Sequence, residues 1–383
     1  MIEKIIALFK PREGSALIRE LVMPYEAAIE PLSKTDRIQG CLYGGAVGDA
    51  LGYVVEFLSI EAIRKQFGNS GVSFDAISLL FPTWDRCVVS DDTQMTMFTA
   101  EGMLAANAAW GDQPSDQRIL DGVREAYLDW YISQQPHSFQ RPIGQLARSP
   151  LMQANRAPGL TCLSACKAGA IGTIARPIND SMGCGGVMRV APIGFLTLPD
   201  ASDYFILGAQ TAALTHGHSM GYIPAGSLSW LVHQLMRGRS LKEAVFGLEE
   251  HLKSVEDADL MRTVLLSAMK IAALPDVTPD FVEVLGGGWV GHECLAIAVL
   301  AALIDVPLQR KFEIAINHSG DSDSTAAVLG NLLGAEYGHQ ALLQIPAYRE
   351  ITAHLDIAPL LGPLIKNLSN WLDSAPNRSA AVE

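Results

Sequence analysis

The sequence predicts an all-α fold, and three observations support that prediction. Apolar residues recur at spacings near 3.6, or fill whole segments, along most of the 383-residue chain. The alternation of β-branched and polar residues that is typical of strands is scarce. The segments between the apolar runs are rich in glycine and proline, as in 138–160 and 174–187. We therefore expect one compact domain of many packed helices, with its chemistry in loops at one end.

The helical pattern is strongest in a series of segments that runs through the chain. Each of them is amphipathic at the helical period or apolar throughout. The longest apolar run, 295–304, is far shorter than the roughly 20 residues of a membrane span, so we expect a buried helix there and no membrane partner. In chain order, the expected helices are 94–106, 121–133, 204–214, 221–236, 241–252, 258–273, 293–303 and 324–337.

Composition and charge exclude several classes of partner. The formal net charge is −13 and there is no run of lysine or arginine, so nucleic acid and anionic membrane surfaces are not expected partners. The N-terminus has a short apolar patch without the layout of a signal peptide. The six cysteines are scattered, and no second ligand pair completes a zinc site around Cys162 and Cys166. We expect a reduced, cytoplasmic protein.

The N-terminal end differs from the rest of the chain. Residues 1–36 combine charges, prolines and short apolar patches, and they precede the first glycine-rich motif. We interpret them as an N-terminal extension that is either packed on the main domain or available to a partner. The main domain is then expected over 37–370, with a C-terminal tail at 371–383.

Two short acidic segments each stand directly before a strong helical run. The first is Ser90-Asp91-Asp92-Thr93, and the second lies in HSGDSDST, residues 318–325. Consecutive side chains point about 100° apart on a regular helix, so these carboxylates can converge only where a loop enters a helix. We therefore expect both acidic segments at helix N-termini.

Two interpretations of the acidic segments are open. Ser, Asp and Thr are preferred N-caps, and the helix dipole favours acids at this end, so capping explains either segment alone. One cap needs only one oxygen, however, whereas both segments carry an aspartate pair with flanking hydroxyls. If the two turns meet, carboxylates about 4 Å apart repel by several kcal/mol. A hard dication with oxygen ligands, Mg²⁺ or Mn²⁺, would compensate this repulsion.

A third element is the small-residue segment 44–57, which ends at Glu56 and Phe57. Its repeated glycines and alanines allow a close approach of the backbone, either to another helix or to a ligand. From this pattern alone, we expect Glu56 to be a surface residue that follows a packed helix.

Taken together, these segments resemble the ADP-ribosylglycohydrolase family over about residues 40–361. The resemblance depends on an ordered set of motifs rather than on any one of them. It implies a compact, orthogonal, multi-helix fold, a dinuclear Mg²⁺ or Mn²⁺ centre, and hydrolysis of the bond between ADP-ribose and an acceptor atom. The motifs are GCLYGGAVGDALGYVVEF (40–57), SDDTQM (90–95), RAPGLTCLSA (156–165), GCGGVMRVAPIG (183–194), LTHGHSMGYIPAG (214–226), GGGWVGHECLAIAVLAAL (286–303) and NHSGDSDSTAAVLGNLLGA (317–335).

The resemblance also implies a role for each matching acidic residue. Glu56 matches the acidic residue beside the metals in this family. Glu56, Asp91 and Asp92 are the candidates for proton transfer, and their individual roles stay open. The implied metal ligands are Ser90, Asp91 and Asp92 for one ion and Asp321 and Ser324 for the other, with Asp323 as the bridge.

The ligand side of the site is implied by two further motifs. The segment from Gly183 to Arg189 resembles the glycine-rich loop that wraps the distal ribose and the pyrophosphate. His216 lies in a Thr-His-Gly segment that is expected near the phosphates. The family often has asparagine where this chain has Cys184, so we expect the backbone cradle without that polar side chain. The expected substrate-binding residues are Gly183, Cys184, Gly185, Gly186 and His216.

Two other residues of these motifs have less specific interpretations. Trp289 is expected to be a core aromatic, because such a residue more often fills a core than stacks on a ligand. Arg189 is compatible with a phosphate contact or with a structural ion pair, and the sequence leaves both open.

These features lead to one expected function and two alternatives. The expected function is a metal-dependent hydrolase that removes ADP-ribose from modified protein side chains, with ADP-ribosyl-arginine as the first choice. The first alternative is a binding or immunity protein that neutralises an ADP-ribosylating toxin through residues 1–36, with or without hydrolysis. The second is a structural relative that keeps the fold without catalysis, and the retained aspartates argue against it.

Overall fold

All regular secondary structure described by the computed structural model is helical. Every regular element is an α-helix or a short 3-10 helix, and extended contacts are limited to two isolated bridges, Cys87–Leu355 and Gly183–Val290. The prediction of an all-α fold is confirmed for this part of the chain. The described residues are 32–74, 81, 86–110, 115–135, 141–198 and 201–374.

Long α-helices follow one another with short connections, and several loops contain a 3-10 helix. The α-helices are α3 (Lys34–Tyr53), α4 (Ile60–Phe67), α6 (Asp91–Trp110), α7 (Asp116–Ser133), α8 (Leu160–Lys167), α9 (Ala201–Ala213), α10 (Ser219–Met236), α11 (Leu241–Leu252), α12 (Asp259–Ala272), α13 (Gly291–Leu303), α14 (Leu308–Ile316), α15 (Ser322–Tyr337), α16 (His339–Leu342), α17 (Pro346–His354) and α18 (Ala358–Ser374). The 3-10 helices are η2 (Leu146–Arg148), η3 (Pro150–Met152), η4 (Cys184–Gly186), η5 (Ala191–Phe195) and η6 (Pro279–Val284).

Each helix expected from apolar spacing is present, with ends that lie within a few residues of the prediction. Most of the difference is at the N-terminal ends, where α6 begins at Asp91 and α15 at Ser322. Such first-turn residues are polar, so they belong to the helix without contributing to its apolar pattern. The segments that are not among the expected helices are those of α3, α4, α8, α14, α16, α17 and α18.

Glycine makes the most extensive helix pair, α3 with α15, possible. A Cβ atom added at Gly48 would lie 2.0 Å from the carbonyl oxygen of Ala326. One added at Gly52 would lie 2.4 Å from the backbone nitrogen of Asp323. The close approach predicted for 44–57 is therefore to another helix, and it places the end of α3 against the beginning of α15. The glycines recur at every fourth position on this face, at Gly40, Gly44, Gly48 and Gly52.

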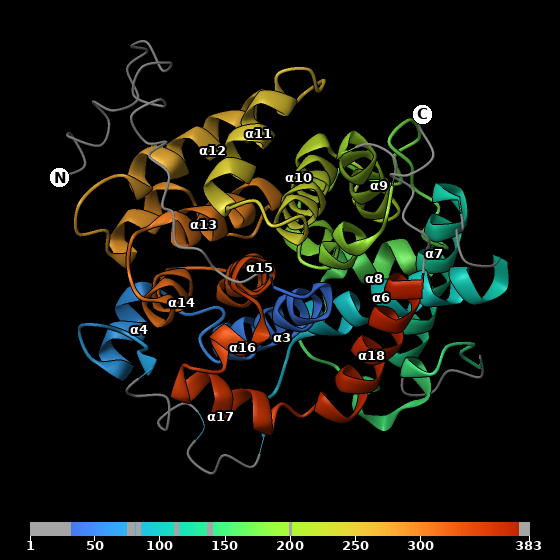
Figure 1. Ribbon diagram of the computed structural model, residues 1–383, viewed down its shortest axis with the longest axis horizontal. Coiled ribbons are helices and arrows are strands. Elements are labelled where there is room, and N and C mark those ends of the chain that lie inside the picture. The colour runs from blue at the N-terminus through green and yellow to red at the C-terminus, as the bar shows by residue number, and fades with distance from the viewer. Residues whose placement is uncertain are drawn as a thin grey trace.

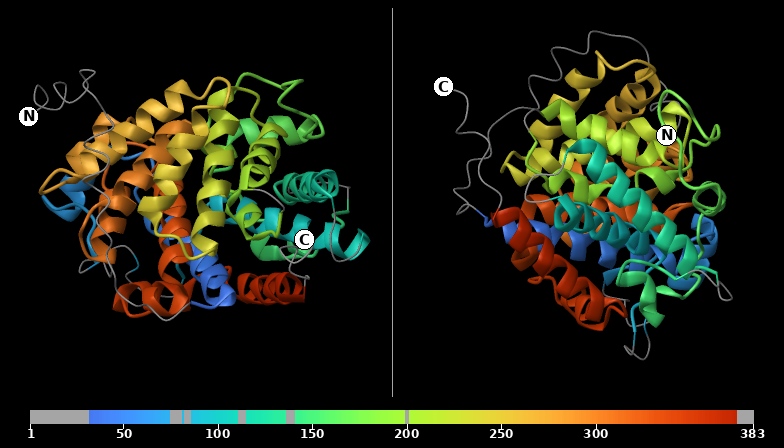
Figure 2. Two further views of the ribbon diagram at one scale, coloured as in Figure 1. Left: turned by 45° about the horizontal axis from the view of Figure 1, so that its top comes forward. Right: turned by 90° about the vertical axis from the view of Figure 1, so that its right-hand side faces the viewer.

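Helix α15 lies near the middle of the molecule, with α3, α10, α13 and α14 around it (Figure 1). Helices α11 and α12 form an outer layer beyond α13, and α17 and α18 cross the opposite face (Figure 2). Burial on several sides explains why α13 and α15 are apolar around most of their circumference. Even so, none of the described helices is both long and apolar enough to cross a membrane.

The first and last described helices can be compared with the predicted domain limits, 37 and 370. Helix α3 begins directly after its N-cap, Ser33, so only 32–36 of the predicted extension are described, and 1–31 lie outside the described residues. Helix α18 continues to Ser374, and Trp371 is buried, so core packing reaches past the predicted limit at 370. The division into extension, main domain and tail stays a prediction.

Candidate metal centre

The beginning of α6 is capped by an aspartate from another helix. Asp49, fully buried on α3, accepts hydrogen bonds from the backbone N–H groups of Ser90 (2.8 Å) and Thr93 (3.0 Å), and from the Thr93 hydroxyl. Burial, followed by the charge of Asp323, raises the pKa of Asp49 to about 7. Asp49 is absent from the predicted site residues. Its sequence signal is slight, a single acid within a run of small and apolar residues.

Because other groups satisfy the first donors of α6, the carboxylates of Asp91 and Asp92 do not cap it. The N–H of Asp91 donates to the carbonyl of Arg156 at 3.1 Å, and that of Asp92 donates to the Ser90 hydroxyl, also at 3.1 Å. The Asp91 carboxylate accepts the N–H of Gly159 at 3.1 Å. Oδ1 of Asp92 is buried with no hydrogen-bond partner. Capping therefore does not account for either carboxylate.

At the beginning of α15, the acidic residues also serve as caps. Asp321 is the N-cap and accepts the N–H of Ser324 at 3.3 Å, and Asp323 accepts the same N–H at 3.0 Å. The second carboxylate oxygen of Asp321 accepts a hydrogen bond from the Cys184 thiol at 2.7 Å. The predicted position of both acidic segments at helix N-termini is confirmed.

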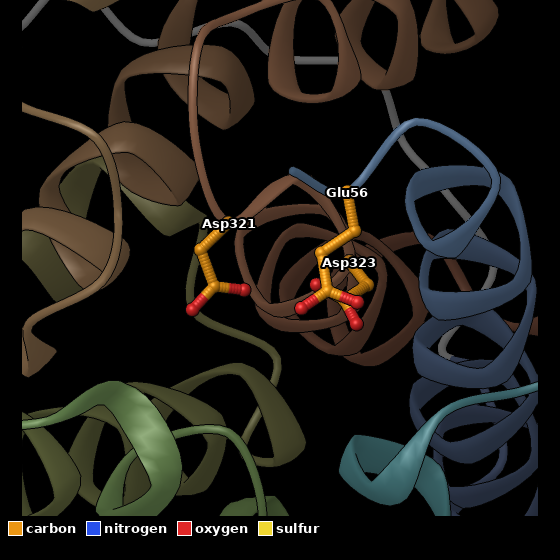
Figure 3. A group of neighbouring side chains, drawn as sticks. All are labelled: Glu56, Asp321 and Asp323. Carbon is orange, nitrogen blue, oxygen red and sulfur yellow. The ribbon is translucent and has the colours of Figure 1, made fainter. Parts of the chain in front are cut away.

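Glu56 reaches the same space from the turn that follows α3. Its N–H donates to the carbonyl of Gly52 at 2.9 Å, one helical turn earlier. Carboxylate oxygens of Glu56, Asp321 and Asp323 all lie within 4.8 Å of one another. Figure 3 shows the carboxylates of Glu56 and Asp323 next to each other, with that of Asp321 to one side. The expectation of a surface Glu56 is wrong, because its Oε2 is buried and has no hydrogen-bond partner.

The charges at the two helix ends act on one another. Burial raises the pKa of Asp91 and of Asp92, and the charge of Asp323, on the other helix, raises both further. Burial and the charges of Asp323 and Asp321 raise the pKa of Glu56 to about 10. Two carboxylates about 4 Å apart repel by about 4 kcal/mol at a protein-like dielectric. Ionising the whole cluster therefore needs a compensating positive charge.

In the part of the chain that the structure describes, no basic side chain supplies that charge. Arg156, which contacts the beginning of α6, pairs with Asp356 instead. The available donors are carboxylate and hydroxyl oxygens, the ligands that hard dications prefer, and the partnerless oxygens of Glu56 and Asp92 are free to coordinate. The cluster therefore fits a dication site. Among the described residues, no lysine or arginine forms an ion pair with Asp49, Glu56, Asp91, Asp92, Asp321 or Asp323.

The predicted ligand loop lies against this acidic cluster. The N–H of Cys184 donates to the carbonyl of Trp289 at 3.0 Å, while its thiol contacts Asp321. A Cβ atom added at Gly185 would lie 3.0 Å from the ring of His216. The Cys184 side chain therefore faces the acidic side of the site. The structure brings together the residues predicted to bind the substrate, Gly183, Cys184, Gly185, Gly186 and His216.

Trp289 is not a core aromatic, contrary to expectation. Its side chain is 43% exposed and stacks on Phe57, with 5.4 Å between the ring centroids. Phe57 has a φ of +67°, a left-handed conformation that bulky residues rarely adopt. The stack connects the turn that carries Glu56 to the segment that holds the glycine-rich loop. Nothing in the sequence pairs these two aromatic residues, because they are far apart along the chain.

Comparison with known proteins identifies the relatives of this chain. A profile of the ADP-ribosylglycohydrolase family matches residues 30–378. The ADP-ribosylhydrolase ARH3 of Bos taurus is 30% identical over 342 residues, which cover 81% of this chain and 86% of the relative. The ADP-ribosyl-[dinitrogen reductase] glycohydrolase of Rhodospirillum rubrum is 26% identical over 323 residues, which cover 79% of this chain and 86% of the relative.

A solved structure has a similar fold. It is named an ADP-ribosylglycohydrolase-related protein complex, and it matches with a TM-score of 0.58 at 23% sequence identity. The match covers 88% of this chain and 99% of the solved chain. At this identity the likeness concerns the fold, and it agrees with the predicted multi-helix domain.

Proposed function

This chain belongs to the ADP-ribosylglycohydrolase family, and from that premise we propose that it hydrolyses ADP-ribosyl-arginine in proteins with the aid of two bound dications. Its membership makes it a hydrolase that removes ADP-ribose from modified proteins. The proposal adds the acceptor residue and the metal centre. The observation that carries it is the convergence of Glu56, Asp321 and Asp323 where α6 and α15 both begin.

Two Mg²⁺ or Mn²⁺ ions are the proposed cofactors. The support for this choice is a cluster of buried oxygen donors, some of them without partners, that no basic side chain among the described residues neutralises. When bound, the ions would act as Lewis acids toward water and toward the hydroxyls of the distal ribose. Ser90, Asp91 and Asp92 would hold one ion and Asp321 and Ser324 the other, with Asp323 between them.

The residues of the chain itself would bind the ligand and move the proton. The N–H groups of Gly183 and Cys184 already donate, to the Ser181 hydroxyl and the Trp289 carbonyl, so the rest of the glycine-rich turn would provide the backbone contact to the pyrophosphate. The cluster carboxylates would stabilise the positive charge that develops on the ribose ring. Glu56 is the first candidate for proton transfer, because its Oε2 has no partner and its pKa is raised to about 10. Asp91 and Asp92 are the other candidates.

Arginine, as the proposed acceptor residue, is carried over from the resemblance stated for the sequence. The relative from Rhodospirillum rubrum is named for an ADP-ribosylated protein, dinitrogen reductase, so a modified protein is the proposed partner here as well. Serine-linked ADP-ribose is the alternative that the experiment below separates. We place the activity in the cytoplasm, since all six cysteines are free.

The toxin-neutralising alternative depends on the N-terminal extension. Residues 1–31 lie outside the described residues, so this alternative stays a prediction from the sequence. Deleting residues 1–31 would test it. Loss of toxin inhibition with retained hydrolysis would assign the two roles to separate parts of the chain.

The test of the proposed function is hydrolysis of ADP-ribosyl-arginine and ADP-ribosyl-serine peptides. Each peptide would be incubated with the wild-type protein and Mg²⁺ or Mn²⁺, with the protein in EDTA, and with Asp323→Ala. Metal catalysis supplies several kcal/mol, so we expect EDTA and Asp323→Ala each to lower kcat/KM by about a thousandfold. Asp259→Ala, which removes a fully exposed carboxylate, is the matched control and should leave the rate unchanged.

The same experiment tests the arginine acceptor separately from the metal centre. Faster hydrolysis of the serine-linked peptide would overturn the acceptor and leave the metal centre standing. Full activity in EDTA would overturn the metal centre.

A further inference from the structure

Arg189 is a buried cation without a carboxylate partner among the described residues. It is fully buried, and its guanidinium lies over the ring of Tyr127, 4.2 Å from the centroid. Nη1 contacts the thiol of Cys162 at 3.3 Å, and Nη2 donates to the hydroxyl of Thr215 at 2.6 Å. The structural ion pair, one of the two interpretations left open by the sequence, is therefore absent among these residues. Full burial also separates this charge from a ligand, so a direct phosphate contact does not explain it either.

The hydrogen bonds of the Thr215 hydroxyl indicate which of its neighbours donates to it and which accepts from it. An arginine can only donate, so Thr215 Oγ1 accepts from Arg189 and retains one proton to give. Two acceptors lie within reach, Nδ1 of His216 at 2.8 Å and the carbonyl of Ala212 at 3.4 Å. The shorter contact is the better hydrogen bond. Donation from Arg189 also polarises the hydroxyl and makes it a stronger donor. Donation along the shorter contact makes Nδ1 of His216 an acceptor that carries no proton, whereas donation to Ala212 would make Nδ1–H a second donor to the hydroxyl.

The opposite edge of the His216 ring faces the glycine-rich loop. A Cβ atom added at Gly185 would lie 3.2 Å from Nε2, and one added at Gly183 would lie 3.5 Å from it. Burial, together with the charge of Arg189, lowers the pKa of His216 to about 3, so the ring is neutral near pH 7. A neutral ring with an unprotonated Nδ1 carries its proton on Nε2.

We propose that Arg189 and Thr215 are positioning residues, which hold His216 as a neutral Nε2–H donor directed at the Gly183–Gly186 loop. The acceptor would be an oxygen of the anionic ligand that this loop is proposed to bind, and in that respect the inference rests on the proposed function. Neither Arg189 nor Thr215 touches the ligand in this arrangement. Their part is to fix which nitrogen of His216 carries the proton.

The test is the tautomer of His216 in the substrate-free protein at pH 7, read from ¹⁵N chemical shifts of histidine-labelled protein. The chain has nine histidines, so the resonances of His216 are assigned by their loss in His216→Gln. We expect a protonated Nε2 and an unprotonated Nδ1 in the wild type and in Thr215→Ser. Thr215→Val removes the donor at similar volume, and we expect its His216 to shift toward the Nδ1-protonated form.

Activity provides a second readout with a matched control. Thr215→Val should raise KM by about tenfold, which is the effect of one lost hydrogen bond, with a smaller change in kcat. Thr215→Ser keeps the hydroxyl and should have the wild-type KM. Thr211→Val is the control, because Thr211 is a buried threonine of α9 whose hydroxyl donates only to the carbonyl of Leu207 at 2.8 Å. It should change neither the tautomer nor KM.

Two results would overturn the inference. One is a proton on Nδ1 of His216 in the wild type, and the other is an unchanged tautomer in Thr215→Val. Because the NMR measurement needs no substrate, an inactive enzyme would count against the proposed function and leave the tautomer result intact.

Discussion

Helices α6 and α15 both begin with a turn of serines and aspartates, but their first N–H groups are satisfied in different ways. In α6 the acceptors come from elsewhere, chiefly Asp49 of α3, and Oδ1 of Asp92 has no partner. In α15 the helix's own Asp321 and Asp323 accept the N–H of Ser324. Similar sequences therefore serve two purposes. The acids of α6 are free for chemistry, whereas those of α15 also hold their helix.

The largest difference should appear when one carboxylate is removed from each helix end. Asp92→Ala and Asp321→Ala should each lower kcat/KM by about a thousandfold, because each removes a proposed metal ligand. Their stabilities should diverge. Asp321→Ala loses an N-cap and about 1 kcal/mol, whereas Asp92→Ala removes a buried carboxyl group that has one oxygen without a partner, and it should not destabilise the metal-free protein. The checks are steady-state kinetics and urea unfolding in EDTA. Greater destabilisation by Asp92→Ala would contradict the comparison.

The next largest effect concerns the contact that places the helix ends together. In Gly52→Ala the new methyl group would lie 2.2 Å from the carbonyl oxygen of Ser322, so α3 and α15 must separate. We expect a loss of about 3 kcal/mol in the free energy of unfolding. Gly362→Ala in α18 is the control, since its methyl group would meet only the Tyr43 hydroxyl, at 3.4 Å. Equal stabilities for the two variants would show that the glycine face is not required.

Removing the Asp49 carboxylate should have a smaller effect than Gly52→Ala, and we expect it mainly in the free energy of unfolding. Asp49→Ala leaves the N–H groups of Ser90 and Thr93 without their acceptor, and we expect a loss of about 2 kcal/mol. Ser33→Ala, which removes the ordinary N-cap of α3, should cost about 1 kcal/mol. Urea unfolding of both variants checks the order. A harmless Asp49→Ala would mean that α6 caps itself with its own acids.

The last prediction concerns a pH dependence of the metal-free protein. The pKa of Asp49 is raised to about 7 and that of Glu56 to about 10, whereas both are near 4 in an unfolded chain. Between those values the folded protein binds more protons, so its stability falls as pH rises from about 4 through 7 and beyond. In EDTA, Tm should therefore be lower at pH 8 than at pH 5.5. Asp323→Asn should flatten this slope, and Mn²⁺ should raise Tm more at pH 8. A Tm in EDTA that increases with pH would contradict the close placement of these carboxylates in the folded protein.

Local patterns predict the helices well where the helix is amphipathic or apolar. Apolar spacing alone does not indicate α3, because its glycines, which are poor helix formers in isolation, hide the helical character of the segment. The recurrence of Gly40, Gly44, Gly48 and Gly52 at every fourth position is a signal that would have identified both the helix and its packing face.

The site is less predictable than the helices, because it depends on contacts between distant segments. The placement of Asp91 and Asp321 at helix starts follows from local rules, but the meeting of those starts follows only from the resemblance to a family. Asp49 could not be identified from its neighbours, since the donors it satisfies lie about 40 residues away in the sequence. The contact between Cys184 and Asp321 spans 137 residues, and no local pattern indicates it.

The most direct test of the central claim is calorimetric titration of the protein with Mn²⁺. If the carboxylates of α6, α15 and Glu56 share one space, binding should be saturable, with about two ions per chain. Asp323→Ala, which removes the carboxylate proposed to lie between the ions, should abolish the tight phase. A wild-type titration without saturable heat, or an Asp323→Ala titration like that of the wild type, would contradict a shared metal centre.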